Sequence, residues 1–435
     1  MKKVILSLVL LTLFILNGAS QPSFGGSIKT SLIYNIAFPY EEDRFDNLIN
    51  PGNFLDIHDI QLTNYFTGKI EGADETSSFS LWITLNTYQI AKALEAAAYD
   101  DEKQTLVVNE TLPFLGTQFT TISLLRAYIS FYVNDILSFT FGRLQMHTGY
   151  GYGWNPVDFT NPLKNPYDPD AELRGVDAVK ATISFGNVFA ASASGVYTGE
   201  GVETGLDVKS IMLSGETTLW LPGIEIIMNG LYEYDESRSE DRIPSAIGAG
   251  CKFNLFDIGI YGEGALRFGS RNIYYNFSRN TFLKTDMLFS ALAGIEYVFP
   301  NELMAVVEYF YNGEGMSDIE KDDFRQSVQE VINMSGYPSS HQLLSIIPGY
   351  LNKHYILCNL TLPLYDLDMD MQLLALFSPD GLMLNLMPSL SFQLTGSLTV
   401  SVGYTGLFDL SDNGLNEASL SPVKYMTDVT VWYYY

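Results

Sequence analysis

Few side chains in this sequence could carry out catalysis or hold a metal ion. The four histidines are His58, His147, His341 and His354. No pair of them has metal-ligand spacing with a third ligand nearby, so no metal site is predicted. His147 stands beside Thr148 and Tyr150, as a base would beside a nucleophile, but the sequence offers no third group to orient it. We therefore predict no enzyme activity, no catalytic residues and no cofactor.

The chemically richest segment is a long loop expected between two strand-like runs, Ile136 to Phe141 and Ala178 to Phe185. Its Gly, Asn and Pro residues supply backbone conformations that regular elements do not use. If Met146 to Gly175 folds into a barrel lumen, its rings would narrow the passage, and its charged residues would tie its base by charge-assisted hydrogen bonds. The residues predicted for this constriction are Arg143, Tyr150, Tyr152, Trp154, Asn155, Pro156, Asp158, Arg174 and Asp177.

This segment resembles a motif of the Gram-negative outer-membrane porins related to the alginate-export family. The matching residues are Gly142, Arg143, Gly153, Trp154, Asn155, Pro156, Asp158, Asn161, Pro162, Arg174, Gly175, Asp177 and Ala178. The sequence departs from the motif where Leu144 separates Arg143 from Gln145 and where Gly153 precedes Trp154. The resemblance implies a porin-like β-barrel. It also suggests that the barrel exports a polyanion or an oligosaccharide.

The rest of the chain consists of runs of about ten to fifteen residues in which apolar and polar side chains alternate. In one run Phe289 and Ile295 share one face, while Ser290 and Glu296 share the other. Roughly eighteen such runs occur, and long and short connections alternate between them. The sequence thus predicts an all-β fold: a single transmembrane antiparallel β-barrel of about 18 strands (16–18), with long extracellular loops and short periplasmic turns.

Charged residues on the polar faces are expected to line the lumen, because charge on a lipid-facing row is costly. These predicted lumen residues are Arg126, Lys180, Glu225, Glu263, Arg267, Asp286, Glu296 and Glu308. Arg143 does not fit, since alternation from Phe139 and Phe141 places it on the lipid side. Either it lies above the membrane or Gly142 introduces a bulge.

Two long connections carry helical patterns, Ile90 to Ala98 and Asp318 to Asn333. Ser317 is a possible N-cap of the second. We expect a short amphipathic helix that covers the rim or lies in the lumen; a partner-binding helix is the alternative.

The two ends of the chain predict export and assembly. Residues 1–20 resemble a cleaved signal peptide, because Lys2 and Lys3 precede an apolar run and small residues follow it. Residues 21–435 would then form the barrel. The last run ends in Trp432 and three tyrosines, and it resembles the signal read by the outer-membrane assembly machinery. The formal net charge of −26 argues against nucleic acid as a partner.

The leading hypothesis is a porin-like channel in the outer membrane for passive passage of small hydrophilic solutes. Because of the acidic balance, neutral or cationic solutes are expected. Its partners would be outer-membrane lipids, the solute and the assembly machinery. The alternative is a surface receptor or adhesin with a plugged lumen and ligand-binding extracellular loops.

Overall fold

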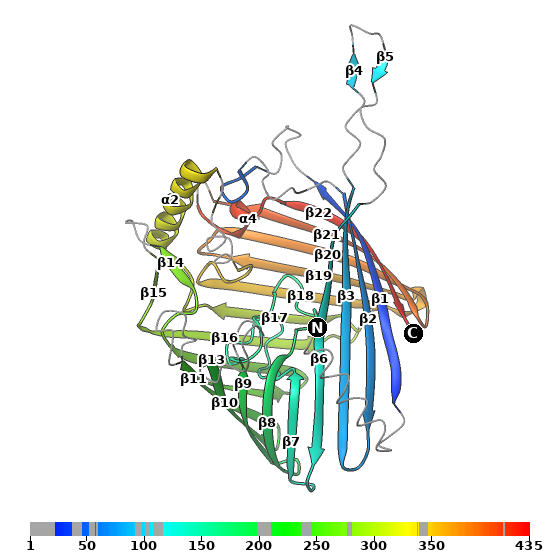
Figure 1. Ribbon diagram of the computed structural model, residues 1–435, viewed down its shortest axis with the longest axis vertical. Helices are drawn as coiled ribbons and strands as arrows, with labels where there is room; N and C mark the ends of the chain where they lie inside the picture. Colours follow the sequence, from blue (N-terminus) through cyan, green and yellow to red (C-terminus); the bar gives the residue numbers. More distant parts are fainter. Residues whose placement is uncertain are drawn as a thin grey trace.

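The computed structural model describes residues 22–36, 46–51, 57, 60–91, 98–100, 105–107, 116–197, 210–235, 245–275, 281–336, 338, 347–411 and 414–435. Within them, 18 strands form one closed antiparallel barrel (Figure 1). Each strand pairs with the next barrel strand along the chain. The last strand pairs with the first, from Ser27 opposite Tyr434 to Ile36 opposite Tyr425, and this pairing closes the ring.

The barrel strands match the predicted runs in number. They are β1 (Ser23–Ile36), β2 (Ile60–Ala73), β3 (Ser77–Ala91), β6 (Gly116–Tyr132), β7 (Leu137–Leu144), β8 (Val176–Phe185), β9 (Phe189–Tyr197), β10 (Ser210–Leu221), β11 (Ile224–Asp235), β12 (Ala246–Leu255), β13 (Ile258–Phe268), β16 (Met287–Val298), β17 (Met304–Tyr311), β18 (His354–Leu364), β19 (Met369–Ser378), β20 (Met383–Thr395), β21 (Leu398–Asp409) and β22 (Tyr425–Tyr434). The predicted all-β barrel is confirmed.

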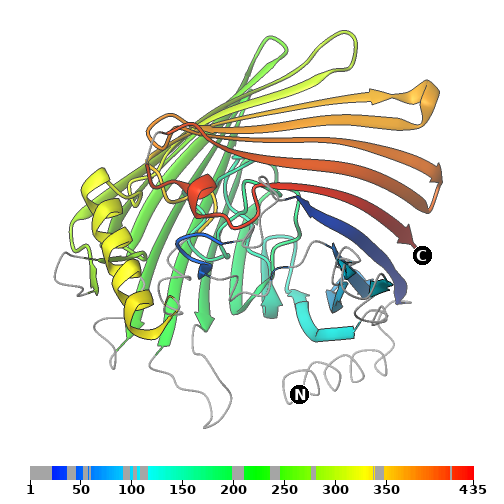
Figure 2. The same ribbon diagram turned by 90° about the horizontal axis from the view of Figure 1, so that it is seen from above.

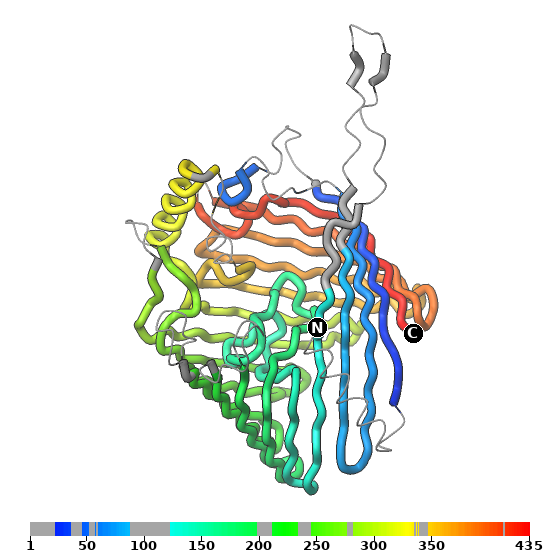
Figure 3. Tube along the Cα trace, viewed as in Figure 1, coloured from blue at the N-terminus to red at the C-terminus, as the bar shows by residue number. Residues whose placement is uncertain are grey.

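The connections alternate in length around the ring, as predicted. Short turns such as Asn134-Asp135 and Phe256-Asp257 lie at one end of the barrel, which we call the turn end. Longer connections lie at the other, the loop end, where β19 and β20 are joined by an exceptionally short link. Figure 3 shows the chain following this up-and-down path in sequence order.

The outer face of the barrel is apolar, and the inner face carries the charges. Phe289 and Ile295 on β16 are 48% and 49% exposed, whereas Glu263 and Glu308 on the opposite face of the neighbouring strands are 5% and 0% exposed. A soluble protein does not expose its apolar strand faces all around a barrel, but a membrane β-barrel must. No helix among the described residues is long and apolar enough to cross a membrane.

A rim cap covers part of the loop end. We use this name for residues 46–51, 312–336, 347–353 and 414–424, which pack with the β14–β15 hairpin (Ile273–Tyr275 and Thr281–Leu283) (Figure 2). Its largest element is α2 (Asp318–Ser335), which begins at Ser317 in a capping box with Glu320 and ends at Gly336. The buried Phe324 and Val328 face the cap core, so the predicted rim helix is confirmed.

The other predicted helix is not found as expected. Ile90 and Ala91 belong to β3, and Ala98 begins the short strand β4 (Ala98–Asp100), which pairs with β5 (Thr105–Val107). Residues 92–97 lie outside the described part of the chain, as does the predicted signal peptide at 1–20. The barrel sheet continues into the first two residues of the proposed helix, whereas Ala98 belongs to a separate two-stranded sheet; at these described ends strand pairing outweighs the local helix preference.

Candidate functional site

The connection between β7 and β8 folds into the barrel. We call residues 145–175 the inner loop; Figures 1 and 2 show it inside the ring of strands. Trp154 and Val157 at its centre are completely buried. The loop is therefore a packed structure against the inside of the wall.

A clamp of two charged residues fixes the base of the inner loop. Arg143, the second-last residue of β7, donates from Nε and Nη2 to the two carboxylate oxygens of Asp177 on β8, at 2.9 and 2.7 Å. Its Nη1 also donates to the carbonyl of Leu124, beside a register shift in β6. A two-point arginine–carboxylate pair fixes direction as well as distance. The clamp therefore holds the point where the chain leaves the wall.

The same pair settles the position of Arg143. The β7–β8 register is unbroken from Leu137 to Leu144, so Gly142 introduces no bulge there. Arg143 shares the outward face of Phe141, at the end of the strand, and its charge is neutralised by Asp177. Gly142 is required for another reason: its φ of 122° belongs to a region that glycine alone enters readily.

The glycine-rich part of the inner loop encloses two carboxylates of the barrel wall. Glu263 of β13 accepts the backbone N–H groups of Tyr150 and Gly151, the second at 3.0 Å. Glu308 of β17 accepts those of Tyr152 and Gly153, the second at 2.8 Å, and also the Tyr261 hydroxyl at 2.7 Å. Hydrogen bonds from N–H groups to a buried charge are stronger than neutral ones. These acids of the lumen thus anchor the loop.

Glycine is needed in this segment for close approach. Gly149 has a φ of 111°, and a Cβ there would lie 2.8 Å from Glu263 Oε1. A Cβ on Gly153 would lie 2.7 Å from the Leu357 side chain and 3.2 Å from Glu308 Oε2. A side chain at either position would push the backbone N–H groups away from the carboxylates.

Trp154 ties the inner loop to the rim cap. Its ring stacks on Phe310 at 5.1 Å between centroids and also contacts Tyr355 at 5.6 Å. Its Nε1 donates to the carbonyl of Gly349 in the cap, at 3.0 Å. A buried indole normally needs such a partner for its N–H. Through this residue the loop, the wall and the cap share one apolar core.

The turn after Trp154 is held from within. The carboxylate of the buried Asp158 accepts the backbone N–H of Asn161 at 3.1 Å and the amide of the same residue at 2.8 Å. Burial raises the pKa of Asp158, and the hydrogen bonds from Asn161 and Thr160 offset this only in part. Asn229 of β11 donates to the carbonyl of Val157 at 2.9 Å and so fixes the turn to the wall.

The returning half of the inner loop is organised by Lys164. Its ammonium group donates to the carbonyls of Gly151 and Tyr152, at 2.9 and 2.8 Å. The backbone N–H groups of these same two residues donate to Glu263 and Glu308. Burial lowers the pKa of Lys164, although Glu308 and Glu263 act in the opposite direction. Tyr350 of the cap donates to the Lys164 carbonyl at 3.1 Å. Hydrogen bonds from Lys164 therefore join the two halves of the loop.

Most of the residues predicted to line the constriction instead pack the inner loop against its surroundings. Trp154, Asn155, Pro156 and Asp158 are buried between the loop and its surroundings, so they anchor the loop and do not line an open passage. Tyr150 and Tyr152 are partly exposed. Arg143 and Asp177 tie the base as predicted. Arg174 is exposed and forms no side-chain hydrogen bond or ion pair with any described residue, while the hydrogen bonds of the Asp158 carboxylate go to its own turn.

The predicted lumen charges mostly lie where expected. The strand registers put them on the inward face, except Asp286, which lies just before β16 at the rim; the inward members are Arg126, Lys180, Glu225, Glu263, Arg267, Glu296 and Glu308. Arg267 pairs with Glu314 of the rim cap, with 3.6 Å between Nε and Oε2. Sequence reasoning missed the anchoring roles of Glu216, which accepts from Thr148 at 2.8 Å, and of Lys164.

Basic residues gather on one side of the lumen wall. Lys69 of β2 and Arg126 of β6 lie 3.6 and 4.0 Å from the ring centroid of Trp82, which stands between them on β3. Lys29 of β1 lies 4.8 Å from the ring of Trp432. Cation–π contacts hold these long side chains against the wall. The acids that anchor the inner loop lie on the other side, on β10, β13 and β17.

The described residues contain no cluster of three or more His, Cys, Asp or Glu side chains placed to hold a metal ion. His147 is exposed. Its neighbour Thr148 donates to Glu216, so this threonine is not paired with the histidine as a nucleophile.

Comparison with known proteins agrees with the fold. The sequence matches no protein-family model and no curated protein. Among solved structures, the chain is similar to Wzi, an outer-membrane protein of Escherichia coli involved in group 1 capsule assembly and described as a carbohydrate-binding β-barrel. The TM-score is 0.50, with 12% identity over 99% of this chain and 87% of Wzi.

Two porins are also similar to the chain. A mutant of the Rhodopseudomonas blastica porin gives a TM-score of 0.44, with 10% identity over 95% of this chain and 100% of the porin. OmpF of Salmonella typhi gives 0.46, with 10% identity over 96% and 99%. None of the three names the alginate-export group, so that narrower resemblance stays a prediction. At these identities the similarity concerns the barrel fold, and function must be argued from the site.

Proposed function

We propose that the protein is a porin-like channel of the outer membrane through which small hydrophilic solutes pass passively. The observation that carries this proposal is the division of the wall into two faces, apolar outside and charged inside, in a closed ring of 18 strands. Charges such as those of Lys29 and Glu296 are useful on an inward face only where water reaches them. The protein would need no cofactor and perform no catalysis.

The inner loop would set the size limit of the channel. It occupies part of the lumen and is held at its base, centre and returning half, so it cannot swing freely with each passing solute. Selectivity in channels arises from such narrowing and from the charges around it. Neutral or cationic solutes remain our proposal, because acids outnumber bases on the inward face.

Export and assembly complete the proposal. Residues 1–20 would be removed as a signal peptide, and β22 would be recognised by the assembly machinery before it closes the barrel against β1. The Trp432 to Tyr435 segment lies at this seam, where Tyr435 and Gly26 exchange backbone hydrogen bonds of 3.2 and 3.1 Å.

A liposome-swelling assay tests this proposal. Purified protein, shown to be folded by heat-modifiable gel mobility, is reconstituted and exposed to uncharged sugars of increasing size. We expect swelling with small sugars and a sharp loss of swelling above a size limit. A folded protein that supports no swelling with any of them would contradict the channel and favour the receptor or adhesin, whose lumen is plugged. Reversal potentials in a salt gradient then test the charge preference.

A further inference from the structure

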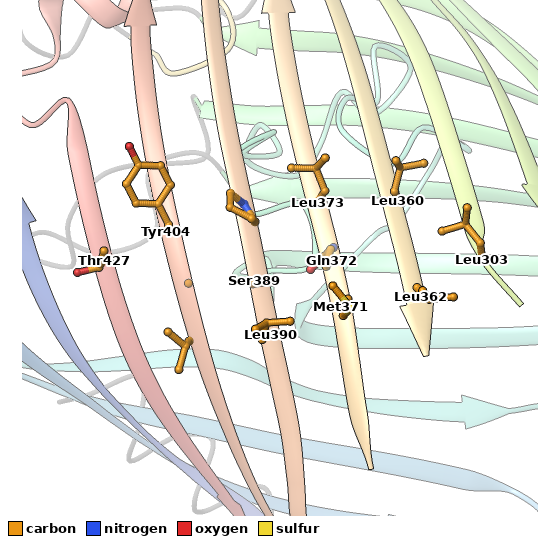
Figure 4. Close-up of a pocket in the computed structure, with 13 residues that line it drawn as sticks. Leu303, Leu360, Leu362, Met371, Gln372, Leu373, Ser389, Leu390, Tyr404 and Thr427 are labelled. Carbon is orange, nitrogen blue, oxygen red and sulfur yellow. The ribbon is translucent and has the colours of Figure 1, made fainter. Parts of the chain in front are cut away.

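A groove of about 540 Å³ runs over the outside of the barrel wall from the start of β17 to β22 (Figure 4). Its sides are formed by outward-facing apolar side chains of four neighbouring strands, among them Leu360, Leu373, Leu390 and Val402. Its floor includes Gly403 and the residues Gln372 and Ser389, whose side chains belong to the inward face. The groove thus lies across the apolar outer face.

The groove coincides with an interruption in the strand ladder. The β20–β21 pairing runs to Leu386 opposite Gly406 and resumes at Ser389 opposite Gly403. Between these pairs stands Pro388, which has no N–H to donate and is rarely found inside a strand away from an edge or a bulge. The compact Pro388 side chain lies between the larger Leu373 and Tyr404, so the outer surface of the wall is recessed at this point.

The lining changes in polarity along the groove. Tyr404 and Thr427 face each other across β21 and β22, and both carry hydroxyl groups. They lie toward the loop end, next to the aromatic pair Phe408 and Tyr425. At the other extreme Leu303 and Leu362 lie near the turn end, where β17 begins and β18 ends. Figure 4 shows Leu303 and Leu362 on the opposite side of the groove from Tyr404 and Thr427.

We propose that this groove binds one acyl chain of a membrane lipid, with the polar part of the lipid at Tyr404 and Thr427. The inference rests on the proposed membrane location. The groove is continuous with the lipid-facing surface, and its polarity follows that of an amphiphile, from hydroxyl-bearing to fully apolar. Among apolar chains in a bilayer there is no hydrophobic gain from association, so a site must hold its occupant by extra packing contacts. A concave wall supplies these contacts on both sides of a chain.

A photo-crosslinking experiment tests the site. The full protein is reconstituted in phosphatidylethanolamine–phosphatidylglycerol vesicles containing a little phospholipid with a diazirine in its acyl chain. After irradiation, labelled peptides are quantified by mass spectrometry. We expect labelling of β18–β21 to exceed that of the outward residues of β8–β12 by about fivefold, the ratio that roughly ten additional close atom contacts would give.

A matched pair of variants shows whether the groove itself is responsible. Val402→Trp fills it, while Val179→Trp adds the same side chain to the outer face of β8; the two valines are 44% and 51% exposed. Val402→Trp should remove the excess labelling, whereas Val179→Trp should leave it unchanged. Both should conduct like the wild type, because both side chains lie outside the lumen.

Three results would overturn the inference. Even labelling around the barrel in the wild type would remove the site while leaving the membrane location intact, and this result does not depend on how the variants fold. No labelling anywhere would contradict the membrane location as well. A dimer in native mass spectra that dissociates in Val402→Trp would show that a second copy of the chain occupies the groove.

Discussion

Glu308 offers the sharpest test of how the inner loop is held. Its carboxylate is completely buried and accepts the N–H groups of Tyr152 and Gly153 and the hydroxyl of Tyr261. In Glu308→Ala these three donors lose their acceptor. An unsatisfied buried polar group costs about 1–3 kcal/mol, so the docked loop should lose about 3 kcal/mol or more. That loss corresponds to an increase of about a hundredfold in the population of loops that leave the wall.

The barrel itself should survive this change, because both neighbouring ladders remain intact. In planar bilayers Glu308→Ala should show larger current fluctuations and a higher mean conductance than the wild type. Glu296→Ala is the matched control: it removes an acid from the same inner face, but one that forms only a partly exposed ion pair with Lys252. Such a pair contributes at most about 1 kcal/mol. If the two variants give the same current traces, Glu308 does not hold the loop.

Further predictions concern the loop, the cap and the outer wall. Replacing Gly149 to Asn161 with a short Gly–Ser linker should leave a barrel with heat-modifiable mobility and raise its conductance; unchanged conductance would place the loop outside the passage. Arg143→Ala should lower the free energy of unfolding by about 2 kcal/mol, since it removes the two-point hydrogen bonding between this guanidinium and the Asp177 carboxylate, while Arg174→Ala should leave unfolding curves unchanged; equal effects would contradict the clamp. Burial raises the pKa of Glu314, but Arg271 and Arg267 outweigh it, so the net pKa lies below the usual 4.5. The stability this acid contributes is therefore complete above that pH and is lost on further acidification, and Glu314→Gln should flatten acid-unfolding curves; an unaltered curve would refute this. The thiols of Cys251 and Cys358 lie on the outer face and should resist a charged maleimide in vesicles but react after denaturation.

Most of the fold could be predicted because a strand with one apolar and one polar face has apolar and polar residues in alternation along its sequence. Phe289, Ser290 and their neighbours alternate along β16, and the same signal recurs in every barrel strand. The alternation of long and short connections predicted which end of the barrel carries the loops and which end carries the turns. Ser317 predicted the start of α2, since an N-cap acts on the first turn of its own helix. The helix predicted for Ile90 to Ala98 was wrong at its described ends, because the helix preference of Ile90, Ala91 and Ala98 is weak compared with strand pairing.

The site could be predicted only in outline. Gly149 to Trp154 were recognised as a functional loop from their own composition, but their partners Glu263 and Glu308 lie more than a hundred residues away. No local pattern distinguishes an acid that lines water from one that accepts loop N–H groups. Arg174 was given a role because it carries a charge next to the loop base, yet it is Arg143 that donates to both carboxylate oxygens of Asp177. Long-range packing decides such roles, and a single sequence does not record it.

The most direct test of the channel is the current through folded, reconstituted wild-type protein in a planar lipid bilayer. We predict stable single-channel steps in salt solution. Neutral polymers below the size limit found in the swelling assay should enter the passage and reduce these steps, whereas larger polymers should leave them unchanged. Protein that is folded and inserted, yet passes no current at any voltage, would contradict a water-filled passage beside the inner loop.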